Sequence, residues 1–378
     1  MKTKAAVLWG ANQDWEVEEV ELGDPVANEV QVELAASGLC HSDEHNRIGD
    51  IPMVEPGAYP FIGGHEGAGV VTKVGPGVTD LKEGDHVVLG FIPSCGRCPS
   101  CATGHQNLCD LGAYLLTGQA ISDHTNRIHV RGQAATPMCL LGTFSPYVTV
   151  HEASAIKIDD DIPLDKAALV GCGVTTGWGS SVYAADVRAG ETVVVIGTGG
   201  IGMNAVQGAR LAGAKRVIAI DPAEMKREKA MELGATHTFS SMAEALEPIA
   251  NMTLGRMAEK AVISVGRIEG EHIQQMLSLI GKGGTGVVTG MGSMTDVDVK
   301  LSLFELTLLE KRLQGAIFGS GNPRFDIPNL LRLYQEGQLM LDELITTTYA
   351  LEDINQGYAD MNAGKNIRGV VMYGDADH

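Results

Sequence analysis

The stretch TVVVIGTGGIG, residues 192–202, predicts the fold of the second half of the chain. Its first five residues are apolar or β-branched, which is typical of a strand covered on both faces of a sheet. The glycines at 197, 199 and 202 then form the pattern G-x-G-x-x-G, and the small residues of 199–212 predict a closely packed helix. The order of strand, glycine turn and helix predicts a dinucleotide-binding βα unit.

The glycine turn has the features that bind the diphosphate of a dinucleotide. Glycine permits a tight turn and a close approach of the phosphates, and the helix attracts them to its N-terminus. Asp221 ends the next apolar run about 20 residues further on, where a carboxylate accepts hydrogen bonds from the adenosine ribose. It also repels a 2′-phosphate, so we expect NAD rather than NADP, although Asp221 can at the same time cap the helix after Pro222. The cofactor-binding residues expected from this pattern are Gly197, Gly199, Gly200, Ile201, Gly202 and Asp221.

The hydrophobic pattern divides the rest of the chain into domains. Apolar strands alternate with helices over residues 174–317, which predicts a doubly wound parallel sheet. Residues 1–173 contain short apolar runs broken by glycine, proline and aspartate, which is typical of an irregular β-rich domain. We expect residues 318–378, where the pattern is mixed again, to return to the first domain. The predicted fold class is therefore α/β, with a β-rich domain interrupted by a doubly wound one.

The composition excludes several classes of function. The 28 Lys+Arg and 47 Asp+Glu give a formal net charge of −19, which repels nucleic acids and anionic membranes. The sequence contains no run of about 18 apolar residues, so we expect no membrane-spanning helix. The apolar stretch at residues 5–9 is too short for a signal peptide. We expect a cytoplasmic protein whose cysteines stay reduced and serve as metal ligands or catalytic groups rather than in disulfides.

Four of the seven cysteines lie close together as Cys95-x2-Cys98-x2-Cys101-x7-Cys109. Four thiolates can complete the tetrahedral shell of one zinc ion and leave no position open for chemistry. An iron–sulfur cluster can also use four thiolates. His105 lies within the same loop, but four sulfurs already suffice. The spacing therefore predicts a structural metal site.

Three further residues are suitable metal ligands, although they lie far apart in the sequence. Cys40, His65 and Cys172 offer two thiolates and one imidazole, which would leave a fourth position open, as a catalytic zinc requires. Spacing alone does not establish that they meet. Cys139 has no partner in either set, and the default expectation for it is a small buried apolar role.

The chain resembles the zinc-dependent alcohol dehydrogenases of the medium-chain dehydrogenase/reductase superfamily. The resemblance covers the whole chain and rests on GHEGAGVVTKVGPGV at residues 64–78, the four-cysteine loop, Gly171-Cys172-Gly173 and the glycine turn. It implies a GroES-like catalytic domain that holds a catalytic and a structural zinc ion, and a Rossmann domain that binds NAD. The implied reaction is the oxidation of an alcohol to an aldehyde or ketone, or the reverse.

The resemblance also implies roles for individual residues. Cys40, His65 and Cys172 match the ligands of the catalytic zinc, and Cys95, Cys98, Cys101 and Cys109 match those of the structural zinc. Among the catalytic residues, Glu66 matches the glutamate behind the metal and Asp43 the carboxylate that holds the ligand imidazole. Ser42 matches the hydroxyl that contacts the substrate oxygen, and His45 the histidine at the solvent end of the proton relay.

Several matches concern the cofactor and the substrate. Thr176 matches a residue beside the nicotinamide, and His41 stands where some relatives have an arginine near the pyrophosphate. Lys226 and Arg368 match contacts to the adenosine ribose and the pyrophosphate; the alternative for both is a solvated surface charge. The two residues expected to line the substrate pocket, for which a core role is the alternative, are Phe91 and Trp178.

A narrower resemblance is to the actinobacterial nicotinoproteins, or NDMA-dependent alcohol dehydrogenases. Three segments carry it, residues 91–118, 159–187 and 201–214. It implies that NAD stays tightly bound during turnover and that electrons leave to an external acceptor, NDMA or the peptide-derived cofactor mycofactocin. The family also implies a homodimer or homotetramer joined through the Rossmann domains, for which the apolar segment 301–318 is a candidate interface.

Three alternatives stay open. One is an ordinary alcohol dehydrogenase that exchanges soluble NAD. Another is a glutathione-dependent formaldehyde dehydrogenase, a group with tyrosine at the position of His45 and an acid at that of Ile51, next to which Asp50 stands here. A third, a non-enzymatic dinucleotide-binding protein, is disfavoured because such proteins commonly lose catalytic zinc ligands, and all three are present.

Overall fold

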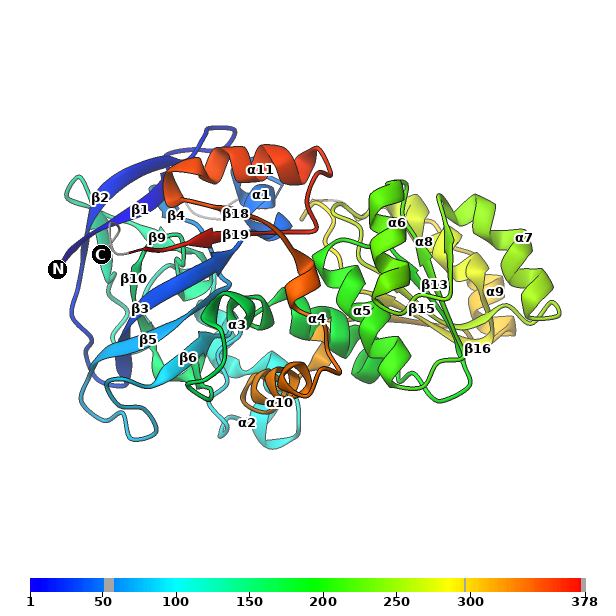
Figure 1. Cartoon of the computed structure of the whole chain (residues 1–378), viewed down its shortest axis with the longest axis horizontal. Helices are drawn as coiled ribbons and strands as arrows, with labels where there is room; N and C mark the ends of the chain where they lie inside the picture. The colour runs from blue at the N-terminus through cyan, green and yellow to red at the C-terminus, as the bar shows by residue number, and fades with distance from the viewer. Residues whose placement is uncertain (51–57, 296, 375–378) are drawn as a thin grey trace. The chain divides into compact units, whose positions relative to one another are not determined.

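The computed structural model describes residues 1–50, 58–295 and 297–374, and Figure 1 shows it as a ribbon. Position 51, which bears on the glutathione-dependent alternative, lies outside these residues. The chain forms two compact units: residues 1–172 with the described residues from 322 onward, and Gly173–Gly321. The structure thus changes unit after Cys172 and after Gly321, whereas the sequence places the changes after residues 173 and 317.

The first unit is rich in β-structure. Its described strands form two mostly antiparallel sheets, with the orders β8-β7-β2-β1-β4-β9 and β11-β6-β5-β3-β19-β18, and β10 pairs with β3. The strands are β1 (Lys2–Leu8), β2 (Glu16–Leu22), β3 (Glu29–Gly38), β4 (Phe61–Ile62), β5 (Gly67–Val74), β6 (His86–Leu89), β7 (Ile128–Val130), β8 (Gln133–Ala134), β9 (Thr136–Pro137), β10 (Tyr147–His151), β11 (Ala155–Lys157), β18 (Ile345–Tyr349) and β19 (Arg368–Met372). The α-helices are α1 (His41–Arg47), α2 (Pro99–Ala102), α3 (Leu164–Val170), α10 (Pro323–Gln335) and α11 (Ile354–Asn362).

Strand β3 lies at the centre of the second of these sheets and determines which segments meet at its C-terminal end. It pairs with β5, β10 and β19, all antiparallel. Because Val370 of β19 lies opposite Gly38, the beginning of β19 lies beside the end of β3. The beginning of β5 lies there as well, since Gly67 pairs with Ser37. Segments from three parts of the chain therefore meet where β3 leads into α1.

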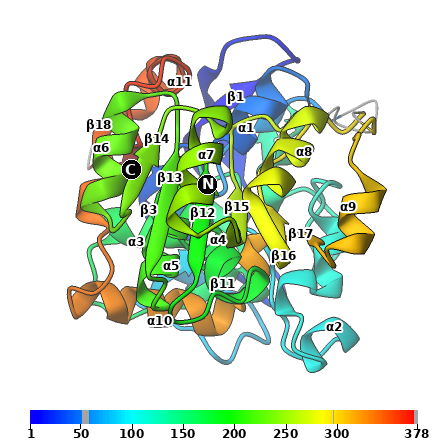
Figure 2. The ribbon, with the colours of Figure 1, turned by 90° about the vertical axis from the view of Figure 1, so that its right-hand side faces the viewer.

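The second unit has the doubly wound parallel sheet that the sequence predicts. The strand order is β14-β13-β12-β15-β16-β17, and every pair is parallel. Helices α5 and α6 cover one face and α7 and α8 the other (Figure 1), and Figure 2 shows the strands side by side. Its elements are α4 (Gly173–Gly179), β12 (Thr192–Ile196), α5 (Gly200–Leu211), β13 (Arg216–Ile220), α6 (Glu224–Glu232), β14 (His237–Phe239), α7 (Met242–Met252), β15 (Ala258–Ile263), α8 (Gly270–Leu279), β16 (Ile280–Val288), α9 (Leu303–Leu308) and β17 (Arg312–Gly315).

Each unit has its own hydrophobic core. In the first, Trp15 lies edge-on to Phe144 with ring centroids 5.7 Å apart and stacks on Tyr358 of α11 at 6.2 Å. In the second, all five residues of β12 are buried, because helices cover both faces of the sheet. Within the described part of the chain, no helix combines the length and the apolarity needed to cross a bilayer.

Candidate metal and dinucleotide sites

The first unit brings together the residues that the sequence leaves far apart. Cys40, His65, Glu66 and Cys172, here called the Cys40 cluster, offer ligand atoms that all lie within 4.8 Å of one another. Cys40 directly precedes α1, His65 and Glu66 directly precede β5, and Cys172 follows α3. Two sulfurs and one imidazole, with the carboxylate of Glu66 beside them, form a donor set that suits a zinc ion.

An aspartate of α1 orients the histidine of this cluster. The carboxylate Oδ2 of Asp43 lies 3.2 Å from Nδ1 of His65, and Oδ1 accepts a hydrogen bond of 2.6 Å from the backbone N–H of Gly64. Both side chains are buried. Burial alone would lower the pKa of His65, but the charges of Asp43 and Cys40 raise it well above its ordinary value. With Nδ1 facing the carboxylate, Nε2 is the nitrogen available to a metal.

Glu66 is held by an arginine of β19. Its carboxylate forms a buried ion pair with Arg368, whose guanidinium also donates a 3.1 Å hydrogen bond to the carbonyl of Leu39. Burial raises the pKa of Glu66 to about 7, although Arg368 opposes the shift. A Cβ on Gly38 would lie 2.2 Å from Glu66 Oε2 and 2.9 Å from Arg368, so a larger residue at the end of β3 would displace this ion pair. Arg368 is thus no solvated surface charge.

Helix α1 carries the other polar residues expected in catalysis. Oγ of Ser42 lies 3.7 Å from Sγ of Cys40. His45 is buried, and its Nδ1 lies 3.2 Å from Oδ2 of Asp50. His41, expected near the pyrophosphate, is the exposed first residue of the helix. The pairing of His45 with Asp50 was not predicted from the sequence.

Two further residues lie near the Cys40 cluster. The ring of Phe91 meets that of His65 edge-on, with centroids 5.7 Å apart. Phe91 therefore lies beside the Cys40 cluster. Burial raises the pKa of Cys139 to about 11, and the charges of His65, Asp43 and Cys40 also act on it. Cys139 therefore lies close to the cluster, which its sequence context does not indicate.

The four cysteines of the loop, here called the Cys95 cluster (Cys95, Cys98, Cys101 and Cys109), also come together. Sγ of Cys95 lies 4.0 Å from that of Cys101, and Sγ of Cys98 lies 3.9 Å from that of Cys109. A tetrahedron with zinc–sulfur bonds of about 2.3 Å requires sulfurs about 3.8 Å apart. The described cysteines form no disulfide. The donor set and its spacing fit one zinc ion.

Backbone N–H groups surround the sulfurs of the Cys95 cluster. Sγ of Cys98 accepts hydrogen bonds of 3.4 Å from the N–H groups of Cys101 and Asp110, and Sγ of Cys95 accepts one of 3.4 Å from Cys98. Burial opposes ionisation of Cys95, but the N–H groups of Arg97 and Cys98 lower its pKa to about 7. Such donors stabilise thiolates and leave them ready to bind a metal.

The glycine turn of the second unit has the geometry of a diphosphate site. Gly197 has φ +82°, and a Cβ on Gly202 would lie 1.8 Å from the carbonyl oxygen of Gly197. A Cβ on Gly199 would meet nothing within 4 Å, so space remains above the turn for a ligand. The buried hydroxyls of Thr176 and Thr198 find no hydrogen-bond partner among the described residues. These features fit a dinucleotide that supplies the missing partners.

Asp221 ties the turn to the next strand. Its Oδ2 accepts a 2.9 Å hydrogen bond from the N–H of Thr198, and its Oδ1 accepts one of 2.9 Å from Ala223, just before α6. The carboxylate thus serves the local backbone and still lies beside the turn. Lys226 is half-buried on α6. Trp178 is buried on α4, and its carbonyl would lie 2.9 Å from a Cβ on Gly208 of α5.

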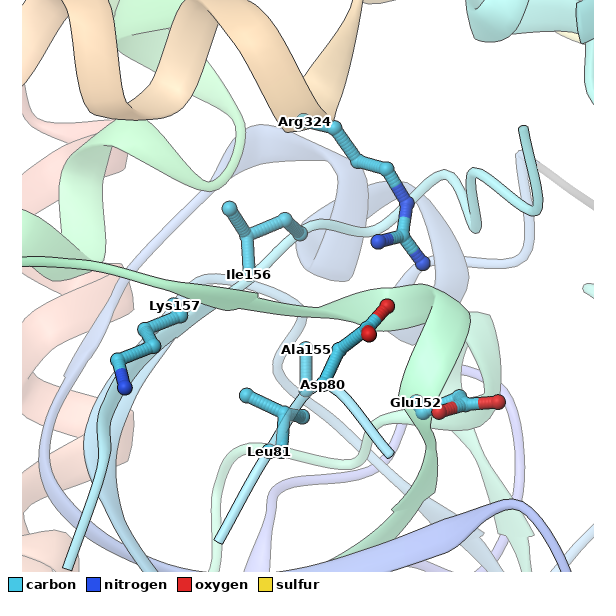
Figure 3. Close-up of a pocket in the computed structure, with 7 residues that line it drawn as sticks. All are labelled: Asp80, Leu81, Glu152, Ala155, Ile156, Lys157 and Arg324. Atoms are coloured by element: carbon cyan, nitrogen blue, oxygen red, sulfur yellow. The ribbon is translucent and has the colours of Figure 1, made fainter. Parts of the chain in front are cut away.

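A separate pocket of about 190 Å³ lies in the first unit (Figure 3). Figure 3 shows the guanidinium of Arg324 and the carboxylate of Asp80 turned toward each other across it. Lys157 points away, because it donates a 2.7 Å hydrogen bond to Asp85. No residue of either cysteine cluster lines this pocket, so it is not part of the candidate active site. The lining residues are Asp80, Leu81, Glu152, Ala155, Ile156, Lys157 and Arg324.

Comparisons with known proteins agree with this geometry. Residues 19–160 match the family described as the alcohol dehydrogenase GroES-like domain, and residues 200–336 match the one described as zinc-binding dehydrogenase. Alcohol dehydrogenase B of Mycobacterium tuberculosis is 55% identical over 377 residues, 100% of both chains. The NDMA-dependent alcohol dehydrogenase of Amycolatopsis methanolica is 53% identical over 373 residues, 99% of both chains.

A solved structure supports the same assignment. The alcohol dehydrogenase zinc-binding domain protein from Burkholderia ambifaria is 33% identical and covers 99% of each chain, with a TM-score of 0.91. The GroES-like and Rossmann fold class predicted from the sequence is therefore confirmed, as is the predicted family. The chain belongs to the NAD-dependent, zinc-type alcohol dehydrogenases of the medium-chain dehydrogenase/reductase superfamily.

Proposed function

We propose that this enzyme oxidises alcohols to aldehydes or ketones at the Cys40 cluster, with a second, purely structural zinc ion at the Cys95 cluster. The observation that carries the proposal is that Cys40, His65 and Cys172 meet, with Asp43 on the histidine. A hydroxyl, Ser42, lies 3.7 Å from the Cys40 sulfur, where it can contact a substrate oxygen. A non-enzymatic dinucleotide-binding protein has no need of such a set.

The chain's own residues divide the work of the site. When bound, zinc would make the substrate hydroxyl easier to ionise, and NAD would accept the hydride. Asp43 keeps Nδ1 of His65 oriented, and Arg368 holds the carboxylate of Glu66. Ser42 and His45 stand three positions apart on α1 and therefore share a face of the helix. The hydroxyl of Ser42 can accept the substrate proton, and the imidazole of His45 can carry it toward solvent.

In the second unit, we propose that the glycine turn binds the diphosphate of NAD. Gly197, Gly199 and Gly202 give the backbone its close approach, and Thr176 offers its unpartnered hydroxyl to the nicotinamide end. Asp221 favours NAD over NADP because its carboxylate repels a 2′-phosphate. Lys226 and His41, which the sequence resemblance assigns to the cofactor, would add positive or polar contacts to it.

We further propose that NAD stays bound during turnover and that electrons leave to an external acceptor. The support is the 53% identity, over 99% of both chains, with a relative named as NDMA-dependent. The acceptor would be NDMA in the assay and, as the narrower sequence resemblance implies, mycofactocin in the cell. In this narrower function the alcohol exchanges with solvent during each turnover, whereas NAD stays in its site.

The test is to denature the purified enzyme without added cofactor and to quantify the NAD released. We expect close to one NAD per chain, together with alcohol oxidation that depends on NDMA and needs no added NAD. Little released NAD and activity only with added NAD would instead identify an ordinary exchanging dehydrogenase. A requirement for glutathione in either assay would identify the formaldehyde-oxidising alternative.

We also propose that a second copy of the chain covers the edge of the parallel sheet. All four residues of β17 are exposed, and the strand lies at the end of its sheet. The preceding helix α9 exposes 71% of Leu303, 73% of Phe304 and 65% of Leu308. An apolar edge of this kind is normally covered. Light scattering should give a dimer or tetramer, and Phe304→Glu should shift it toward the monomer.

A further inference from the structure

The end of helix α1 forms a Schellman motif, a standard C-terminal cap, with an unusual occupant. Ile48 is the cap residue, and Gly49 follows with φ +79°. The N–H of Gly49 donates to the carbonyl of Asn46 at 3.3 Å, and the N–H of Asp50 donates to that of His45 at 2.9 Å. These two hydrogen bonds define the motif, and they turn Asp50 back over the helix beside His45.

The side chains then repeat the contact that the backbone makes. Oδ2 of Asp50 lies 3.2 Å from Nδ1 of His45, and only 13% and 6% of these side chains are exposed. The two positions brought together by this motif are commonly hydrophobic. Here they hold a carboxylate and an imidazole that water reaches poorly, so their interaction is weakened little by solvent.

Stability of the helix does not account for this carboxylate. The C-terminal end of a helix carries partial negative charge and favours cations, so Asp50 lies at an unfavourable place. Glu44 shows how a structural acid of the same helix behaves: it accepts hydrogen bonds from Arg47 at 2.7 and 2.8 Å and from Asn362 at 2.8 Å. Glu44 anchors α1 to α11, whereas Asp50 faces His45, the histidine of α1 to which the proposed function gives the proton relay.

We propose that Asp50 is a positioning residue that holds His45 as the Nδ1–H tautomer, so that Nε2 is the nitrogen that accepts the substrate proton. The inference rests on the proposed function, in which His45 receives the substrate proton by way of Ser42 and carries it toward solvent. Nδ1–H donates to Asp50 throughout. The proton released from the alcohol reaches Nε2 through Ser42 and later leaves from Nε2 to solvent, and none is transferred to Asp50. Such a carboxylate acts by fixing the ring and its tautomer rather than by taking the proton.

The first test reads the tautomer directly by ¹⁵N NMR of the zinc-loaded enzyme with labelled histidine. The signals of His45 are those lost in His45→Gln. We expect protonated Nδ1 and unprotonated Nε2 in the natural protein. In Asp50→Asn the amide can donate to Nδ1, so we expect the tautomer to change to Nε2–H, at least in part. Retention of pure Nδ1–H in Asp50→Asn would overturn the proposal.

The second test separates positioning from a general structural role. Asp50→Asn should lower kcat for alcohol oxidation about 10- to 100-fold and change KM less than about twofold, since general-base assistance is worth about 10²–10⁴-fold. In the His45→Gln background the same change should have almost no further effect. An additive loss in the double variant would overturn the proposal, because Asp50 would then act on another group.

Controls make the outcomes distinguishable. Asp14→Asn, whose side chain is 83% exposed, should leave the kcat and the His45 signals unchanged. Asp50→Ala removes the carboxylate without adding a donor and replaces Asp50→Asn if that variant unfolds; a mixture of tautomers is then expected. If His45→Gln keeps the full kcat, the relay of the proposed function fails, while the NMR result still decides whether Asp50 sets the tautomer.

Discussion

The Cys95 cluster takes its four sulfurs from one loop, whereas the Cys40 cluster takes its ligand atoms from three separate segments of the first unit. Backbone N–H groups of the same loop surround the first cluster. Charged side chains from α1 and β19 surround the second. A site made and supported by one loop can stabilise that loop. A site made where distant segments meet can be tuned by each of them, which is what catalysis requires.

The two clusters also differ in the set of ligands that they offer to a zinc ion. Four sulfurs close the coordination shell of a zinc ion, while two sulfurs and one imidazole leave a position for substrate. The two clusters should therefore respond differently to the loss of one ligand. Loss at the Cys40 cluster should remove activity with little unfolding, and loss at the Cys95 cluster should unfold the loop while the chemistry of the folded molecules persists.

The largest expected effect is that of Cys40→Ser. We expect kcat/KM to fall about 10³-fold or more, because the metal contributes several kcal/mol to transition-state stabilisation. The zinc content should fall by one ion per chain, as measured by elemental analysis, and Tm should change little. Cys139→Ser, which removes a thiol outside both clusters, should keep the full zinc content. Unchanged activity in Cys40→Ser would refute the assignment of catalysis to this cluster.

Cys98→Ser tests the other side of the comparison. Sγ of Cys98 accepts two backbone hydrogen bonds besides its place in the cluster. We expect loss of one zinc ion and a stability loss of about 3 kcal/mol or more, since structural zinc contributes directly to folding. For a unit of this size, that corresponds to a Tm lower by roughly 6–12 °C.

The activity of folded Cys98→Ser should stay close to that of the natural enzyme. The matched control is Ser100→Ala in the same loop, which removes a 2.7 Å hydrogen bond to Asp110 and should change stability by about 0.5 kcal/mol at most. Thermal unfolding followed by circular dichroism measures both. A Cys98→Ser enzyme as stable as Ser100→Ala would show that the Cys95 cluster holds no structural metal.

Asp43→Asn addresses the surroundings of the ligands rather than the ligands. The carboxylate lies 3.2 Å from Nδ1 of His65, and loss of such a partner typically weakens metal affinity about 10- to 100-fold. Competition with a zinc-binding dye measures this affinity. Asp110→Asn beside the Cys95 cluster should have no comparable effect, because the backbone N–H of Asp110, not its carboxylate, reaches the sulfur. Equal losses of zinc affinity in Asp43→Asn and Asp110→Asn would contradict this difference between the two clusters.

The contrast between the clusters also explains how far the sequence could be interpreted. Spacing alone predicted that the four loop cysteines form one metal site, because ligands within one short segment must lie close together. The glycine turn could be predicted for the same reason, since strand, turn and helix are consecutive. For Cys40, His65 and Cys172, the sequence pattern alone did not show that the three residues come together. Only the family resemblance predicted a common site.

The remaining features depend on long-range pairing or on how one helix ends. Arg368 reaches Glu66 because β19 pairs with the end of β3, a register that no local pattern encodes. Asp50 reaches His45 because α1 ends at Ile48 and Gly49 takes a positive φ. A glycine after a helix is a recognisable stop signal. The contact between Asp50 and His45, however, depends on the exact residue at which α1 ends, and the sequence does not give that residue.

Glu66→Gln has the smallest expected effect on zinc and decides whether the Cys40 cluster is open at all. Arg368 engages the carboxylate of Glu66, so we expect it to be no permanent ligand. Zinc content should stay at the natural value, and affinity should change less than about tenfold, the lower bound typical for loss of a supporting partner. Glutamine can still accept a hydrogen bond from Arg368, but the buried guanidinium loses its counter-charge. Stability should therefore fall by roughly 1–3 kcal/mol.

His65→Gln is the matched comparison, since it changes the neighbouring residue and should lose one zinc ion per chain. If Glu66→Gln loses an ion as well, Glu66 is a fourth ligand and the Cys40 cluster is closed like the Cys95 cluster. Substrate would then have to displace a carboxylate before binding. If only His65→Gln loses the ion, three protein ligands suffice, and the difference between the clusters lies in the position that Arg368 keeps open by holding Glu66.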